Sequence, residues 1–152
     1  MAHIFQINIS KGGVPKRPVH EAEITKLGVD GDRQEHTEIH GGADRAICLF
    51  SLEKIITLQE EGHPIFPGST GENLTITGLN WDEIKPGIQM AIGDEVILEM
   101  TKPTQPCKQI RPSFSDQNSN RILEDKMPGW SRYYARVLKT GKIKTGDKVS
   151  LL

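Results

Sequence analysis

Alternating apolar and polar residues divide much of this chain into short segments of the length expected for β-strands. HIFQINIS, residues 3–10, alternates in this way, and AEITKL, residues 22–27, is a second such segment. RAICLF, residues 45–50, is an apolar run typical of a buried strand, and KVSLL, residues 148–152, is another strand candidate. MAIGDEVILEM, residues 90–100, predicts two strands about a Gly-Asp turn or one long bent strand. The pattern indicates a mainly β protein.

Helical patterns are few. Ser51 can cap a helix over residues 51–61, whose apolar residues follow helical spacing until Gly62 and Pro64 end it. NRILEDK, residues 120–126, is a shorter helical candidate. We therefore expect a closed β-barrel with a few short helices, because closure pairs many strands without leaving exposed edges.

Composition narrows the function classes. The 152 residues show no repeat or linker-like stretch, so we expect one domain over residues 1–152. The formal net charge is -1 with both signs mixed along the chain, which gives no bulk attraction to nucleic acid or anionic lipid. No apolar run has the length of a signal peptide or a membrane span, so we expect a cytoplasmic protein. Its two cysteines lie far apart in sequence and are expected to be free thiols.

Glycines, carboxylates and arginines gather in GVDGDR, residues 28–33, and HGGADRA, residues 40–46. Adjacent glycines let backbone N–H groups approach an anion, and arginine grips phosphate with paired donors. The candidate anion contacts here are Arg33, Gly41, Gly42 and Arg45. A pair of turns carrying surface ion pairs is the alternative interpretation.

A divalent-metal site is a further hypothesis for the same segment. His36 and His40 are four residues apart, and Asp32 and Asp44 lie near them in sequence. The glycines that follow argue against one regular helix presenting both rings, so the metal hypothesis is the weaker one.

The stretch PGSTGENLT, residues 67–75, is rich in glycine and hydroxyl groups. It lacks the Gly-Lys-Ser/Thr ending of a phosphate-binding P-loop and is no dinucleotide fingerprint. Glu72 and Asn73 can hydrogen-bond a polar ligand or brace the loop, and bracing is the commoner role of such residues.

The stretch TKPTQPCKQIRP, residues 101–112, places Cys107 after a proline and beside two cations. Lys108 and Arg111 can favour the thiolate form of the cysteine, which is both a nucleophile and a soft metal ligand. Cys48, by contrast, is flanked by apolar residues and is predicted to fill the core.

Five segments in order resemble a MOSC domain, the fold at the C-terminus of molybdenum cofactor sulfurases. They are GVDGDR, HGGADRAICLFS, PGSTGENLTITGL, IGDEVILEMTKPTQPCKQI and GWSRYYARVLKTGKIKTGD, and together they span nearly the whole chain. The opening INISKGGVPKRPV is similar to the small stand-alone bacterial branch of that family, which is associated with resistance to N-hydroxylated purine bases.

The resemblance implies a barrel-centred fold, like that of pyruvate kinase, which binds molybdenum cofactor (molybdopterin). Cys107 occupies the motif position of the cysteine that ligates molybdenum in the family's reductases. These reductases deliver two electrons to cleave an N–O bond. No flavin, haem or iron–sulfur motif is present in the sequence, so a separate electron-donor redox protein is expected.

Two features of larger relatives have no counterpart in these 152 residues. One is the pyridoxal-phosphate domain of full sulfurases, so we do not expect a complete sulfurase. The other is an N-terminal domain that helps enclose the cofactor in amidoxime-reducing relatives. Without it we expect a more open site or help from a second subunit, as in a homodimer.

The preferred hypothesis is a molybdenum-cofactor reductase of N-hydroxylated bases or related compounds, with Cys107 as metal ligand. The predicted cofactor or substrate anion contacts are Arg33, Arg45, Lys108 and Arg111, and His40, Asp32 and Asn73 are predicted to position polar groups or deliver protons. Two alternatives stay open: a sulfur carrier using a Cys107 persulfide, and a cofactor-binding module without catalysis.

Overall fold

The computed structural model describes residues 1–33 and 42–152. The strands are β1 (His3–Ile9), β2 (Arg17–Val19), β3 (Glu21–Thr25), β4 (Gly28–Val29), β5 (Ile47–Ser51), β6 (Leu74–Thr77), β7 (Gln89–Ile92), β8 (Val96–Pro103), β9 (Tyr133–Lys139), β10 (Gly141–Lys144) and β11 (Val149–Leu151). The helical segments are α2 (Leu52–Glu60) and the short 3₁₀ helices η1 (Ala43–Arg45), η2 (Trp81–Glu83), η3 (Lys108–Ser113) and η4 (Ser119–Ile122). The predicted mainly β class with few short helices is confirmed.

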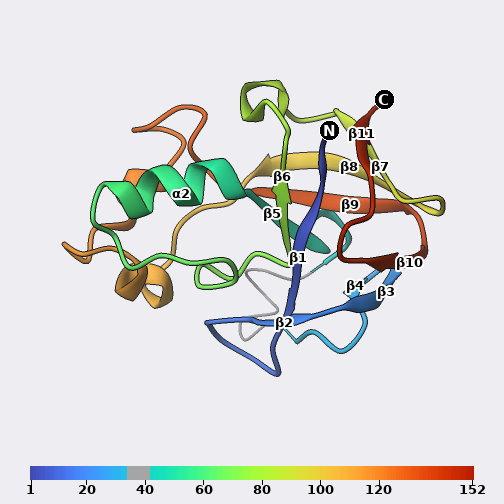
Figure 1. Ribbon diagram of the computed structural model, residues 1–152, viewed down its shortest axis with the longest axis horizontal. Helices are drawn as coiled ribbons and strands as arrows, with labels where there is room; N and C mark the ends of the chain where they lie inside the picture. Colours follow the sequence, from blue (N-terminus) through green and yellow to red (C-terminus); the bar gives the residue numbers. More distant parts are fainter. Residues whose placement is uncertain (34–41) are drawn as a thin grey trace.

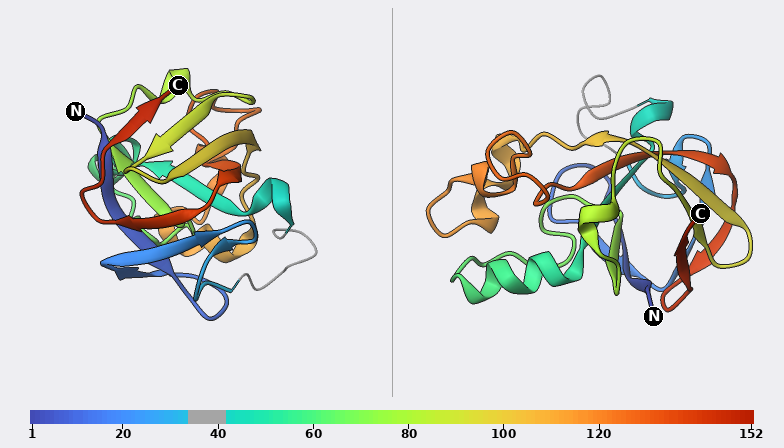
Figure 2. Two further views of the ribbon diagram at one scale, coloured as in Figure 1. Left: turned by 90° about the vertical axis from the view of Figure 1, so that its right-hand side faces the viewer. Right: turned by 90° about the horizontal axis from the view of Figure 1, so that it is seen from above.

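The strands form two sheets. One has eight strands in the order β11-β7-β8-β9-β5-β6-β1-β2, and the other has three in the order β10-β3-β4. Both curve around a shared interior (Figure 2). Among the described residues neither sheet closes, so the predicted closed barrel is wrong. The reason lies in β1, whose second edge is divided between β2 and a single bridge from His3 to Lys148.

The pattern of apolar and polar residues correctly predicted the positions of β1, β5 and the β7–β8 hairpin. β1 buries Ile4 and Ile7 completely, although they are three residues apart, and its pairing register with β6 shifts between Ile4 and Gln6, which interrupts strict alternation. The apolar run at residues 45–50 becomes β5, which is buried along its length because it lies between β6 and β9. Residues 90–100 form the β7–β8 hairpin, with Gly93 at its turn.

The two helix predictions had different outcomes. Ser51 caps α2 as predicted, because its hydroxyl accepts a hydrogen bond from Lys54 N at 3.2 Å. The helix predicted at residues 120–126 is wrong as an α-helix. Only the 3₁₀ turn η4 forms there, because Leu123 already has extended backbone angles.

Helix α2 and the connection from β8 to β9 extend together from one end of the sheets (Figures 1 and 2). This connection runs over residues 104–132 and contains η3 and η4, and Phe114 anchors it in the core with no exposed surface. It brings Cys107 and Arg132 to the end of β5. No helix in the described part of the chain is long and apolar enough to cross a membrane.

Candidate functional site

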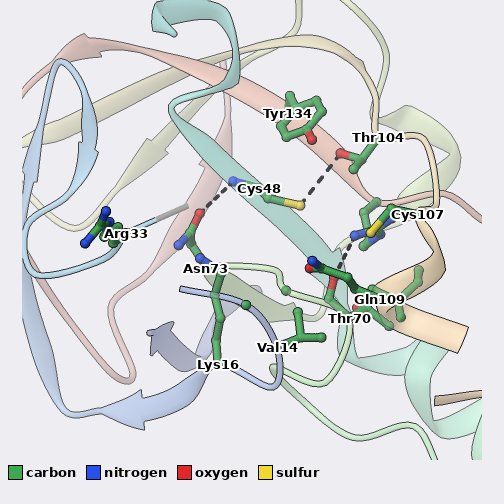
Figure 3. A pocket seen from close by; sticks show the side chains of 14 residues that line it. Val14, Lys16, Arg33, Cys48, Thr70, Asn73, Thr104, Cys107, Gln109 and Tyr134 are labelled. Atoms are coloured by element: carbon green, nitrogen blue, oxygen red, sulfur yellow. Dashed lines mark hydrogen bonds between the residues drawn. The ribbon is translucent and has the colours of Figure 1, made fainter. Parts of the chain in front are cut away.

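One pocket joins segments that are far apart in sequence (Figure 3). It contains about 540 Å³ of space free of atoms, part of it open to solvent. Both thiols of the chain line it, Cys48 and Cys107. Its charged lining residues are Lys16, Arg33 and Arg132, and its polar ones include Thr70, Asn73, Thr104, Gln109 and Tyr134.

Cys107 stands at the start of η3, on the connection between β8 and β9. It is partly buried and packs against the hydrophobic core, while its thiol belongs to the pocket lining. The backbone is extended at Cys107, and its carbonyl accepts a hydrogen bond from Ile110 N at 3.2 Å, so the first turn of η3 fixes its position. A half-buried thiol on a pocket wall is accessible to a ligand and held in place for it.

Cys48 is buried as predicted, but it does not lie in the middle of the core. Its side chain faces the pocket from β5, with Sγ 3.7 Å from Thr104 Oγ1. Burial raises the pKa of the Cys48 thiol, so it is a neutral thiol at neutral pH. An apolar run predicts a buried strand without showing which of its two faces borders a cavity.

Lys16 and Asn73, which line the pocket, form a fully bonded cluster with Asp32, which does not line it, and we call this part of the lining the paired wall. Lys16 Nζ lies 2.7 Å from both carboxylate oxygens of Asp32, and both side chains are almost completely buried. Asp32 also accepts hydrogen bonds from Ser10 N at 2.8 Å and from Asn73 Nδ2 at 2.9 Å. The charges of this wall cancel each other.

Asn73 fixes the paired wall to the sheet. Its Oδ1 accepts a hydrogen bond from Cys48 N at 3.0 Å, and its backbone N–H donates to Cys48 O at 2.7 Å. Gly68 holds the backbone of Lys16, because its carbonyl accepts a hydrogen bond from Lys16 N at 2.9 Å. Its φ of 90° and the nearby Lys16 carbonyl leave no room for a side chain at this position. Asn73 therefore positions its neighbours, as the bracing interpretation expects.

A second part of the lining, which we call the unpaired wall, contains Cys107 and Arg132. Arg132 is 5% exposed, and its guanidinium donates to Thr70 O at 2.6 Å and to Gln105 O at 3.3 Å. Its Nε is buried without a hydrogen-bond partner, and no ion pair forms at this arginine within the described residues. A buried cation without an acid is unfavourable by itself, so an anionic ligand is the natural complement.

Tyr134 adds a hydroxyl to the unpaired wall. Burial raises the pKa of this phenol far above its usual range, so it stays protonated at neutral pH. The Arg45 guanidinium carbon lies 5.8 Å from the Tyr134 ring centroid. Arg45 thus contacts a pocket residue without lining the pocket itself.

The other predicted site residues lie in three kinds of place. Arg33 lines the pocket and is exposed at its rim. Gly42 begins η1, while the exposed Lys108 and Arg111 belong to η3, and none of these three lines the pocket. His40 and Gly41 lie outside the described residues, as does His36. Within residues 1–33 and 42–152 no cluster of three His, Cys, Asp or Glu side chains could hold a metal ion.

The lining residues that the sequence reasoning missed include Lys16, Arg132 and Tyr134. Lys16 lies in the opening stretch, and Arg132 and Tyr134 lie in GWSRYYARV, so these residues belong to segments that carried the family resemblance. The signal in Arg132 was a cation between a serine and two tyrosines at the start of a strand. Arg132 can be recognised as a site residue only from the structure, which shows that it is buried.

A search against protein-family models matches the MOSC domain over residues 36–150. The chain belongs to the MOSC domain family. It is 30% identical over 142 residues to YflK of Bacillus subtilis, covering 92% of this chain and 63% of YflK. It is 26% identical to YiiM of Escherichia coli, covering 87% of this chain and 59% of YiiM.

A protein of Gibberella moniliformis named "Reductase" is 34% identical over 131 residues, which cover 82% of this chain and 22% of that protein. The chain thus spans less than two thirds of the length of each of these relatives. The crystal structure of YiiM from Geobacillus stearothermophilus matches the fold with a TM-score of 0.75 and 27% identity, covering 100% of this chain and 75% of that one.

Proposed function

We propose that this MOSC-domain protein binds molybdenum cofactor in the pocket and reduces N-hydroxylated bases or related compounds. The observation that carries the proposal is the joint placement of Cys107 and the unpaired Arg132 on one wall. A soft sulfur and a buried cation without an acid are the two groups that an anionic cofactor with a soft metal requires.

The residues present fit such a group. Cys107 would ligate the metal, and Arg132, with Arg33 at the rim, would hold the anionic part of the cofactor. When bound, the cofactor supplies a metal centre that can pass two electrons to an N–O bond.

The chain's own side chains have separate tasks in this proposal. Arg132 orients the anion through guanidinium N–H groups other than the two that donate to Thr70 O and Gln105 O. Tyr134 remains a neutral hydroxyl that can donate a hydrogen bond. The apolar parts of Val14 and Ile110 limit water around the site.

The Gibberella relative gives independent support for reduction as the reaction class, because the part it shares with this chain belongs to a protein named as a reductase. In our proposal the two electrons for each turnover come from a separate redox protein of the host. A reduced chemical mediator replaces that protein in an assay.

The test uses protein purified from a host that makes the cofactor. We expect near-stoichiometric molybdenum with extractable pterin, and conversion of an N-hydroxylated purine to the parent base when reduced mediator is supplied. Zinc in place of molybdenum, with no pterin, would overturn the proposal. Near-stoichiometric molybdenum content without turnover would show that the protein is a cofactor-binding module and not a reductase.

A sulfur carrier is the second candidate function, and the presence of both thiols on one pocket favours it. In that case a persulfide on Cys107 holds the transferable sulfur. Cyanide-labile sulfur that disappears in Cys107→Ser, together with no reduction of N-hydroxylated bases, would select the carrier over the reductase.

A further inference from the structure

Glu72 is a completely buried carboxyl group directly behind the pocket, on the loop before β6. Its Oε2 accepts hydrogen bonds from Gly68 N and from Thr75 Oγ1, both at 3.0 Å. Its Oε1 accepts one from Thr70 Oγ1 at 2.8 Å. None of these donors is a cation, whereas Asp32 on the paired wall is bonded to Lys16. Glu72 therefore has hydrogen bonds without a compensating charge.

The surroundings of this carboxyl favour its neutral form. Burial raises the pKa of Glu72 from 4.5, and the three hydrogen bonds oppose that effect only in part. The titratable and charged groups around it are the Cys48 thiol on β5, the Arg132 guanidinium bonded to the carbonyl of Thr70, and Lys16, whose charge is taken by Asp32. A protonated carboxyl is an available proton donor.

Thr70 connects this proton to the pocket. Its hydroxyl contacts Glu72 on one side, and the residue itself lines the pocket. Thr75 contacts the same carboxyl with its hydroxyl but lies in β6 and is not a lining residue. Each of the two threonines thus donates one hydrogen bond to Glu72, but only Thr70 also lines the pocket.

We propose that Glu72 supplies a proton to the pocket through the Thr70 hydroxyl. The use of this proton in catalysis rests on the proposed reductase function. Reduction of an N-hydroxylated amine takes up two electrons from the redox partner and two protons, breaks the N–O bond, and gives the amine and one water. In the structure the Thr70 hydroxyl donates to Glu72 Oε1. For the transfer this hydroxyl turns toward the pocket and gives its proton to the departing oxygen, while Thr70 Oγ1 takes the proton of Glu72. Water at the open side of the pocket supplies the second proton to nitrogen, and later returns one to Glu72 by the reverse path.

An infrared measurement tests the path without any turnover. The wild type should show a carboxylic-acid C=O band well above pH 4.5, and Glu72→Gln should lack it. After transfer into D₂O the band should shift quickly in the wild type and in Thr70→Ser, which keeps the hydroxyl. The shift should be at least about tenfold slower in Thr70→Val and unchanged in the matched control Thr75→Val. Equal exchange rates in Thr70→Val and Thr75→Val, or absence of the band in the wild type, would overturn the path.

Turnover of the cofactor-loaded protein tests the use of that proton. We expect Glu72→Gln to keep its molybdenum content but lower kcat by about 100-fold, and to lose the decline of kcat as pH rises through the Glu72 pKa. Unchanged kcat in Glu72→Gln would overturn the role in reduction. Exchange that depends on Thr70, in a wild type that reduces no N-hydroxylated base, would overturn the reductase function and leave the proton path standing.

Discussion

The two charged walls of the pocket differ in whether their charges have partners. On the paired wall, Lys16 and Asp32 neutralise each other at 2.7 Å in a buried site. On the unpaired wall, Arg132 is equally buried, yet only two backbone carbonyls accept its hydrogen bonds. Folding alone accounts for the first arrangement, because each buried charge is compensated. It does not account for the second, which is why we assign ligand binding there.

The largest expected effect of a substitution on stability is at the paired wall. Asp32→Asn leaves the Lys16 ammonium buried without its carboxylate, so the free energy of unfolding should fall by about 3–5 kcal/mol. Denaturant unfolding of the purified variant measures this change. The control is Glu21→Gln, which removes a partner from the exposed pair with Lys142 and should change stability by less than about 1 kcal/mol.

If Asp32→Asn is as stable as the wild type, the paired wall is not held by this ion pair. The claim that the two walls differ in charge compensation would then be contradicted at Lys16 and Asp32. Asp32 was predicted from sequence to position polar groups or deliver protons. Its four hydrogen-bond contacts support a positioning role.

A substitution at the unpaired wall is expected to have a smaller effect, and this effect is on cofactor retention and not on stability. Arg132→Lys keeps the charge but loses the planar set of donors, so cofactor retention should fall about tenfold at high salt. Molybdenum content after a high-salt wash measures it. The control is Arg45→Lys, which alters an arginine beside Tyr134 that does not line the pocket, and it should retain the cofactor.

Equal retention in Arg132→Lys and the wild type would show that the buried guanidinium serves the fold. If Arg45→Lys loses cofactor and Arg132→Lys retains it, Arg45, the residue predicted from sequence, is the anion contact and Arg132 is not.

The smallest expected effect is at Cys48. The sequence alone predicts a cost of about 1–3 kcal/mol for Cys48→Ser, because an apolar strand would offer the new hydroxyl no partner. In the structure Thr104 Oγ1 lies 3.7 Å from Cys48 Sγ and can hydrogen-bond a serine there. We therefore expect a loss below about 1 kcal/mol in thermal or denaturant unfolding. A loss above 3 kcal/mol would mean that Thr104 does not partner this side chain.

Much of the fold could be predicted because its signals are local. The alternation in β1, the apolar run of β5 and the cap at Ser51 each depend on residues adjacent in sequence. β9 was not predicted, although Tyr133–Lys139 is rich in residues that favour strands. Barrel closure was predicted wrongly because it depends on how β1 shares its edge, which is a contact between distant segments.

The site was predictable only in part for the same reason. Cys107 could be selected from its Pro-Cys-Lys setting, and Arg33 from the glycines before it. Lys108 and Arg111 were chosen for closeness in sequence to Cys107, but η3 turns both toward solvent. Arg132 reaches the pocket from 25 residues beyond Cys107, a distance that only the folded connection between β8 and β9 closes.

The most direct test of the account is the sulfur coordination of molybdenum in protein from a host that makes the cofactor, measured by X-ray absorption. The wild type and Cys48→Ser should contain near-stoichiometric molybdenum with the same number of sulfur ligands. Cys107→Ser should lose one sulfur ligand or the metal itself, because a hard oxygen is a poor replacement for a soft sulfur. Unchanged molybdenum coordination in Cys107→Ser would contradict the central claim that this thiol holds the metal.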